Sequence, residues 1–402
     1  MFAAFKERFW LPPRAHGQVI EDRTVGFIEL FYDLVYVVVI ARAAHHLAEH
    51  LTWRGVGEFA VIFGMIWLAW LNGSIYHDLH GREDGRSRTY IFLQMGILAV
   101  LAVYTSDAGA ATGRGFAITY TVFLLLMTWM WYTVRRQDAG RWASTTARYL
   151  AGMGSSVVIV TVSIFLADDA RLIVWAAFLV AWVALSFSMR GELGSGDLRA
   201  TDSTVERFGL FTIIVLGEVV VGVVTGLSDA VLDFRVMATG LIGLGIGFGA
   251  WWTYFDFVGR RHPRPEASVQ WMFSHLPISM GIAAAGAALV SLVEHASDRQ
   301  APAATAWVLT GSIAVVLIGL TMAMTALQDF RKLASIYRPL MWALASSVGA
   351  VVLIGWWRPV PWMLVLALFA VLSAVWLFAV DRWLRHPNPD DVLPGAVGHS
   401  QG

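Results

Sequence analysis

Twelve apolar runs of about 20 residues follow one another along this chain, and they constrain its fold more than any other feature. Backbone groups in lipid must be hydrogen-bonded within their own segment, so such runs form helices and not open strands. Only 14% of the residues are charged, against about 25% in soluble domains. We predict an all-α integral membrane protein with about twelve transmembrane helices. They are expected at 27–46, 55–76, 88–106, 115–134, 148–167, 171–188, 207–227, 236–257, 269–294, 304–327, 339–357 and 360–380.

The basic residues alternate sharply between the loops that join these runs. Of 29 Lys and Arg residues, 22 lie in the N-terminal segment, the even-numbered loops and the tail, and six lie in the odd-numbered loops. The remaining one, Arg42, lies inside the first run. By the positive-inside rule both termini face the cytoplasm. This predicts a multi-pass protein of the plasma membrane with both termini inside.

Weak sequence echoes suggest an internal duplication. Tyr76-His-Asp78 is echoed by Tyr254-Phe-Asp256, and Gln94 by His275, at similar offsets. Two parallel six-helix repeats would be related by a pseudo-two-fold axis along the membrane normal, a plan known in transporters. The expected divisions are a cytoplasmic or interfacial segment 1–26, repeat 1 at 27–188, a cytoplasmic linker 189–206, repeat 2 at 207–380 and a disordered cytoplasmic tail 381–402.

Ionisable side chains inside the apolar runs are the candidate functional residues, because burying them in lipid is costly. Glu29, Asp33 and Tyr36 are spaced i, i+4, i+7 and share one helix face. The substrate or ion pathway is predicted to use Glu29, Asp33, Tyr36, Asp78, Glu206, Glu218, Asp256 and His275.

Structural roles compete with this interpretation. Acids in a first turn stabilise the helix dipole, and Ser203-Thr-Val-Glu206 fits a capping box. Arg148 and Arg338 are expected to form gating or purely structural ion pairs with the acids. Asp33 and Glu218 lie deepest and have no basic residue one turn away, so function is favoured most strongly for these two.

Several kinds of chemistry have no support in the sequence. The chain has no cysteine, its net charge is zero, and it contains no phosphate-binding loop. We therefore expect no cofactor, no nucleic-acid partner and no ATP-driven pumping by this chain alone. His46 and His50 are spaced i, i+4 and are weak candidates for a metal site. The glycine stripe from Gly240 to Gly249 favours helix packing over nucleotide binding.

The first run resembles a known signature. Glu29-Leu-Phe-Tyr-Asp33-Leu-Val-Tyr-Val, followed by His46-Leu47, is similar to the signature of the bacterial low temperature requirement protein A family. The segment from Glu206 to Glu218 resembles its second signature and His275-Leu-Pro a third. The resemblance implies an integral membrane protein but assigns no residue a known role. A fainter similarity, through Phe31-Tyr-Asp33, is to lysosomal potassium/proton channels built from two six-helix repeats.

Three functions remain in competition at this level. A secondary transporter coupled to protons or cations is favoured, because it needs buried carboxylates between parallel halves. A cation or proton channel is the first alternative. Against it, Asp33 of repeat 1 aligns with Leu210 of repeat 2, so the two repeats would not line a pore with matching rings of charge. A membrane-embedded lipid-modifying enzyme is the second, without a clear nucleophile, so enzyme activity is not favoured. The partners expected are the lipid bilayer and an unknown small solute or ion, and homo-oligomerisation stays open.

Overall fold

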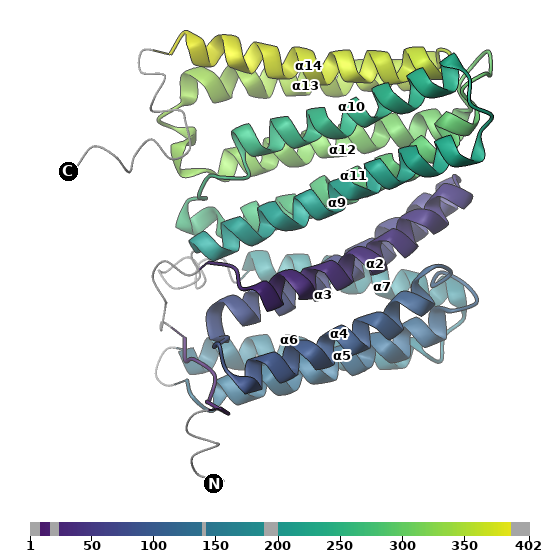
Figure 1. Cartoon of the computed structure of the whole chain (residues 1–402). Helices are drawn as coiled ribbons and strands as arrows, with labels where there is room; N and C mark the ends of the chain where they lie inside the picture. Colours follow the sequence, from purple (N-terminus) through teal and green to yellow (C-terminus); the bar gives the residue numbers. More distant parts are fainter. Residues whose placement is uncertain (1–8, 17–23, 139–141, 189–199, 387–402) are drawn as a thin grey trace. The chain divides into compact units, whose positions relative to one another are not determined.

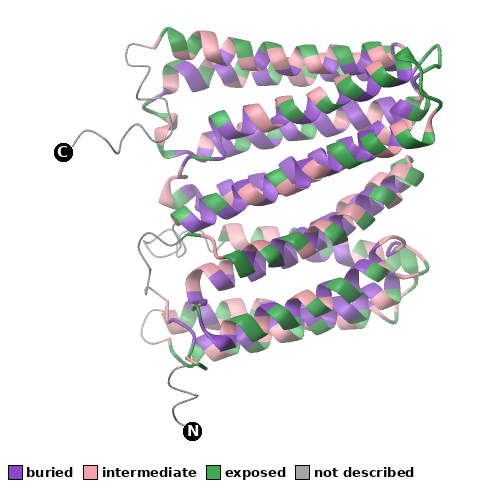
Figure 2. Cartoon of the chain, viewed as in Figure 1, coloured by how far each residue is buried: buried purple, intermediate pink, exposed green. Residues whose placement is uncertain are grey.

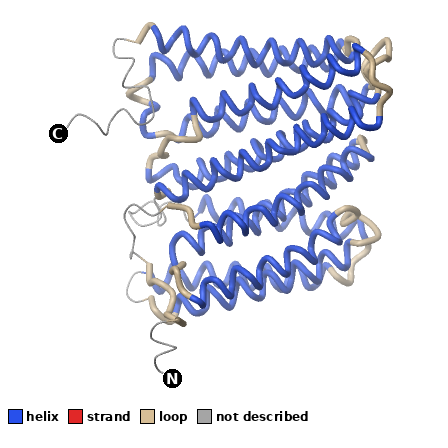
Figure 3. The backbone as a smooth tube through the Cα atoms, viewed as in Figure 1, coloured by secondary structure: helices blue, strands red, loops and turns tan. Residues whose placement is uncertain are grey.

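The computed structural model describes residues 9–16, 24–138, 142–188 and 200–386. Within these ranges the chain forms twelve long α-helices and two short 3-10 helices, with no β-strand (Figures 1 and 3). The elements are α2 (Phe27–Glu49), α3 (Trp53–His80), α4 (Gly85–Thr105), α5 (Gly113–Arg135), α6 (Trp142–Ser163), α7 (Asp168–Ser188), α9 (Asp202–Asp229), α10 (Phe234–Phe257), η1 (Pro265–Ala267), α11 (Ser268–Glu294), α12 (Ala303–Ala326), η2 (Gln328–Phe330), α13 (Ala334–Trp357) and α14 (Pro361–Leu384).

Each predicted apolar run corresponds to one of these helices, which confirms the all-helical fold. The helices extend beyond the runs in places, because polar residues at the ends continue the same hydrogen-bonded turns. Helix α9 begins at Asp202, inside the expected linker, and α14 ends at Leu384, inside the expected tail. Residues 189–199 of that linker and 387–402 of that tail lie outside the described residues, as do residues 1–8 and 17–23 of the N-terminal segment.

Ten of the described helices are long and apolar enough to cross a membrane, two fewer than the twelve spans predicted. The two others are α2, which carries Glu29, Asp33 and Arg42, and α6, whose first turns carry Ser, Thr and Arg side chains. Along α2 one apolar stripe is nevertheless more than half exposed. Its residues are Phe27, Phe31, Leu34 and Val38, at the spacing of a single helix face (Figure 2).

The chain divides into two compact units. Unit 1 comprises Met1–His46 and Gly57–Arg207, and unit 2 comprises Leu47–Val56 and Phe208–Gly402. In unit 1, sequential helices pack as neighbours from α4 to α7. In unit 2, α11 packs on α12, α12 on α13, α13 on α14, α14 on α10, and α10 back on α11, which closes a ring of five helices.

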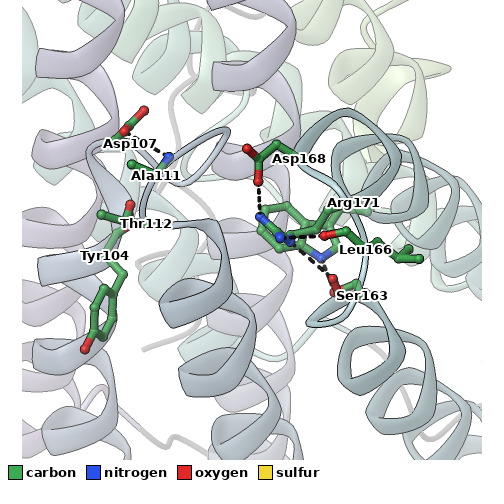
Figure 4. A network of polar contacts seen from close by, with 9 residues as sticks. Tyr104, Asp107, Ala111, Thr112, Ser163, Leu166, Asp168 and Arg171 are labelled. Carbon is green, nitrogen blue, oxygen red and sulfur yellow. Dashed lines mark hydrogen bonds and ion pairs between the residues drawn. The ribbon is translucent and has the colours of Figure 1, made fainter.

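A buried arginine closes the turn between α6 and α7 in unit 1. Arg171 donates hydrogen bonds to the carbonyl oxygens of Ser163 and Leu166 and to Asp168 Oδ1, at 3.1, 2.7 and 2.8 Å (Figure 4). These bonds satisfy carbonyl groups that the end of α6 leaves without a helical partner. The Arg171 side chain therefore holds this turn in place. From the sequence it was assigned only as a basic residue of a loop.

The segment 9–16 is held against the end of α3. Arg14 donates to the carbonyl oxygens of Gly81 and Asp78, at 2.8 and 2.7 Å. Beyond it, His16 contacts Asp138 Oδ2 through Nδ1 at 2.8 Å. Burial opposes ionisation of Asp138, but the bonds from His16 and Thr146 outweigh it, so the pKa of Asp138 lies below its ordinary value.

Glycines let the helices of unit 2 approach closely. A Cβ atom on Gly222 of α9 would lie 2.1 Å from the carbonyl oxygen of Gly286 on α11. Gly243 and Gly247 of α10 face Leu289 and Val219, while other glycines of the stripe face α14. The packing role expected for the stripe is therefore confirmed.

We predict that Gly222→Ala lowers the melting temperature of the purified protein in detergent, because the added methyl group pushes α9 and α11 apart. Overpacking of this kind costs about 1–3 kcal/mol. The matched control is Gly217→Ala on the same helix, where a Cβ atom meets nothing within 4 Å. This control is expected to be neutral or slightly stabilising. Equal melting temperatures for the two variants would contradict the close packing.

Candidate functional site

A buried ion pair lies at the centre of the polar residues of unit 1. Asp33 on α2 is fully buried, and its Oδ1 accepts a hydrogen bond from Arg207 Nη2 at 3.0 Å. The same oxygen accepts a second bond from Trp70 Nε1 on α3 at 2.9 Å. The guanidinium carbon of Arg207 lies 5.6 Å from the centre of the Tyr32 ring. We call Tyr32, Asp33, Trp70 and Arg207 the Asp33 cluster.

The first turn of α9 positions Arg207. Thr201 caps this helix: its Oγ1 accepts from the Thr204 N–H at 3.1 Å, and the Thr204 hydroxyl accepts from the Thr201 N–H at 3.3 Å. Asp78, near the end of α3, accepts hydrogen bonds from the hydroxyls of Thr201, Ser203 and Thr204. A carboxylate at this place also stabilises the helix dipole. The capping pair is thus Thr201 with Thr204, and the expected box of Ser203 with Glu206 is wrong.

A second hydrogen-bonded series adjoins the Asp33 cluster. The Tyr32 hydroxyl donates to Gln94 Oε1 at 2.7 Å and lies 3.1 Å from the Tyr36 hydroxyl. Gln94 Nε2 in turn lies 3.2 Å from His77 Nε2. Gly73 makes room for the series, because a Cβ atom there would lie 2.2 Å from the Tyr32 hydroxyl oxygen. Tyr36, expected in the pathway, is therefore buried and hydrogen-bonded beside the ion pair.

The other predicted residues of unit 1 lie at helix ends. Glu29 Oε2 accepts from the Gly26 N–H at 3.3 Å, which caps α2. Glu206 is exposed and accepts from the Val25 N–H at 3.1 Å. Arg148 is exposed. The partner of Asp33 is Arg207, which the sequence had counted as a loop charge.

Unit 2 holds the remaining predicted residues. Glu218 on α9 is 5% exposed and has no hydrogen bond or ion pair with any described residue. His275 on α11 is buried, with Nε2 3.0 Å from the Tyr254 hydroxyl and Nδ1 2.8 Å from the carbonyl oxygen of Trp271. Asp256 is exposed and accepts a bond from Trp376 Nε1 at 2.9 Å. Arg338 is exposed on α13.

The weak metal candidates come together at the end of α2. Ligand atoms of His46, Glu49 and His50 lie within 4.8 Å of one another. His46 Nε2 also lies 3.9 Å from Glu58 Oε2. Exposed groups at one helix end are close by virtue of their spacing alone, so this proximity does not by itself indicate a metal site.

Sequence reasoning missed the partners of Asp33. Arg207 lies 174 residues away and was counted as a cytoplasmic loop charge, because it precedes an apolar run. Trp70 lies in the middle of a buried helix, where the sequence does not distinguish a tryptophan that donates a hydrogen bond from one that only packs. The available signal was that Arg207 directly precedes a long apolar run, where a buried guanidinium needs a nearby anion.

Comparison with known proteins identifies the family of this chain. The sequence profile of the bacterial low temperature requirement A protein (LtrA) matches residues 24–376. The chain belongs to this family. An uncharacterized protein of Rhizobium meliloti strain 1021, RA0937, is 26% identical over 290 residues, which cover 65% of this chain and 68% of that protein. No solved structure matches. The LtrA chain is thus a multi-pass membrane protein of a bacterial family.

The Asp33–Arg207 pair predicts a strong coupling between two distant residues. Removing one partner of a buried pair leaves an uncompensated charge and costs about 3–5 kcal/mol. Asp33→Asn and Arg207→Gln should therefore each lower the melting temperature markedly. The free energy of unfolding lost in the double variant should be smaller than the sum of the two single losses, by about 0.5–3 kcal/mol.

The control for this cycle is the exposed pair of Asp381 and Arg385, whose atoms lie 2.8 Å apart. Loss of this exposed pair should lower the free energy of unfolding by no more than about 1 kcal/mol, because water screens the charges. Additive effects of Asp33→Asn and Arg207→Gln would contradict the pairing.

Proposed function

We propose that this LtrA protein is a secondary transporter coupled to protons or another cation. The observation that carries the proposal is Glu218, a buried carboxylate within an apolar 28-residue helix that has no partner among the described residues. A carboxylate at membrane depth without a counter-charge is costly to keep ionised. A bound proton or cation removes that cost, so Glu218 is suited to take up and release one during a transport cycle.

The two deep carboxylates would then have different roles. Glu218 would carry the coupling ion, whereas Asp33 is already compensated by Arg207 at 3.0 Å. An ion pair of this kind can gate a pathway if its partners separate in one state and meet in another. Arg207 takes the gating role that the sequence suggested for Arg148 and Arg338. Tyr36 and His275 would hydrogen-bond the solute or hold a proton near these sites.

The finer architecture belongs to the same proposal. We infer that α2 and α6 also cross the membrane, since α2 exposes an apolar stripe opposite its polar face. With twelve spans, the distribution of basic residues supports cytoplasmic N- and C-termini for a protein of the bacterial plasma membrane. The sequence echoes support two parallel repeats.

Flux in proteoliposomes tests the transport function. With a pH gradient imposed across vesicles that contain the purified chain, a proton-sensitive dye should report uptake above that of protein-free vesicles. If the cation is not a proton, the same assay with sodium or potassium gradients should show it. Glu218→Gln should reduce the flux to the level of protein-free vesicles, because a neutral amide binds neither ion.

The matched control is Glu294→Gln, an exposed residue at the end of α11 that should leave the flux unchanged. Wild-type flux that persists in Glu218→Gln would contradict the role of Glu218. No proton or cation flux in the wild type would contradict coupled transport.

The cysteine-free chain allows a direct test of orientation. Single cysteines at Glu266 and Gln300 lie in successive loops, on exposed residues. A membrane-impermeant maleimide added to intact cells should label Gln300→Cys and leave Glu266→Cys unlabelled until the cells are broken. The reverse pattern would show that the termini face outward.

A further inference from the structure

We propose that the Asp33 cluster is a binding site for an organic cation with a guanidinium or primary ammonium group, and that Arg207 is its resident occupant. This inference rests on the proposed transport function in one respect: it identifies the bound cation as the transported solute. The binding step stands on the geometry of unit 1, because Asp33, Tyr32, Trp70 and Arg207 all belong to that unit.

Arg207 uses little of its hydrogen-bonding capacity in this site. A guanidinium has five N–H donors, and buried arginine–carboxylate pairs are frequently bidentate. Here only Nη2 has a partner, and Nε and Nη1 are buried without a hydrogen-bond acceptor. The side chain is nevertheless only 4% exposed. Buried donors without acceptors are costly, so this guanidinium is held less well than a better-fitting cation could be.

The surroundings of Arg207 are those that recognise a cation. The carboxylate of Asp33 supplies a charged acceptor, and its Oδ2 is buried without a partner. The Tyr32 ring presents its π-system 5.6 Å from the guanidinium carbon, within the range of a cation–π interaction. The Trp70 indole bond to Oδ1 holds the carboxylate in place.

Local charge favours a cation over an anion. Glu29 is also buried and lies one helical turn before Asp33 on α2, so a second carboxylate adds to the negative potential near the cluster. A metal ion fits poorly, because Mg²⁺ and Ca²⁺ require six or more oxygen ligands. Asp33 offers a single unused oxygen, far fewer ligands than either metal ion needs. An organic cation instead needs one carboxylate and one aromatic face.

Exchange with Arg207 gives the site a gating property. A guanidinium ligand that donates hydrogen bonds to both oxygens of Asp33 forms the bidentate pair that Arg207 lacks, and it displaces the arginine side chain. The exchange is one cation for another, so Asp33 never stays buried without a counter-charge. Because Arg207 lies in the second turn of α9, which begins at Asp202, its release would loosen the start of that helix.

Binding of radiolabelled guanidinium to the purified full-length chain in detergent tests the proposal. Arg207→Gln removes the occupant and should bind guanidinium about tenfold more tightly than the wild type, because the site no longer has to be vacated. Asp33→Asn should abolish binding. Urea, a neutral molecule of the same shape, should not compete. Arg385→Gln, an exposed arginine at the end of α14, is the matched control.

A second comparison keeps the wild-type ion pair. Tyr32→Leu should weaken guanidinium binding about fivefold, because it removes the aromatic face, while Tyr32→Phe should not. Folded Arg207→Gln protein that binds no better than Asp33→Asn overturns the proposal. If Arg207→Gln does not fold, equal binding by Tyr32→Leu and the wild type overturns it. Flux that depends on Glu218 without any guanidinium binding would refute this inference and leave the transport function standing.

Discussion

Burial of one negative charge governs the arrangement of unit 1. Asp33 lies about 9 Å beyond the start of α2, at 1.5 Å per residue, and it is fully buried. Its charge is tolerated because Arg207 and Trp70 both donate to one of its oxygens. Arg207 can do so only if α9 begins where it does, and Asp78 together with the Thr201 cap fixes that start. One carboxylate thus determines the relative positions of α2, α3 and the start of α9.

The two deep carboxylates of this chain, Asp33 and Glu218, are the same chemical group in different surroundings, and the surroundings give them different properties. Asp33 has a charged partner, an indole donor and an aromatic neighbour, and it is suited to hold a cation in a fixed geometry. Glu218 has apolar surroundings and no partner among the described residues, and it is suited to change its state of charge. Transport requires both properties, since one site must recognise a solute while another couples its movement to an ion gradient.

The sequence predicted the helices well because each needs only a long apolar run and the rule that lipid forbids unpaired backbone groups. Asp33 and Glu218 were found for the same reason, as charges within such runs. The partners of Asp33 were missed because contact between residues 33 and 207 depends on tertiary packing, which hydropathy does not encode. Helix ends were misplaced for a similar reason. Helix α9 starts at the Thr201–Thr204 cap, and hydropathy alone assigns such small polar side chains to a loop.

A high-resolution cryo-electron microscopy map of the protein in lipid nanodiscs tests the central claim most directly. The account predicts that the Arg207 guanidinium contacts a single oxygen of Asp33, with the Trp70 indole on the same oxygen and the Tyr32 ring beside it. When guanidinium is added, density should appear against Asp33 and the Arg207 side chain should turn away. An Asp33 carboxylate that faces water or lipid, with Arg207 elsewhere in the absence of any ligand, would contradict it.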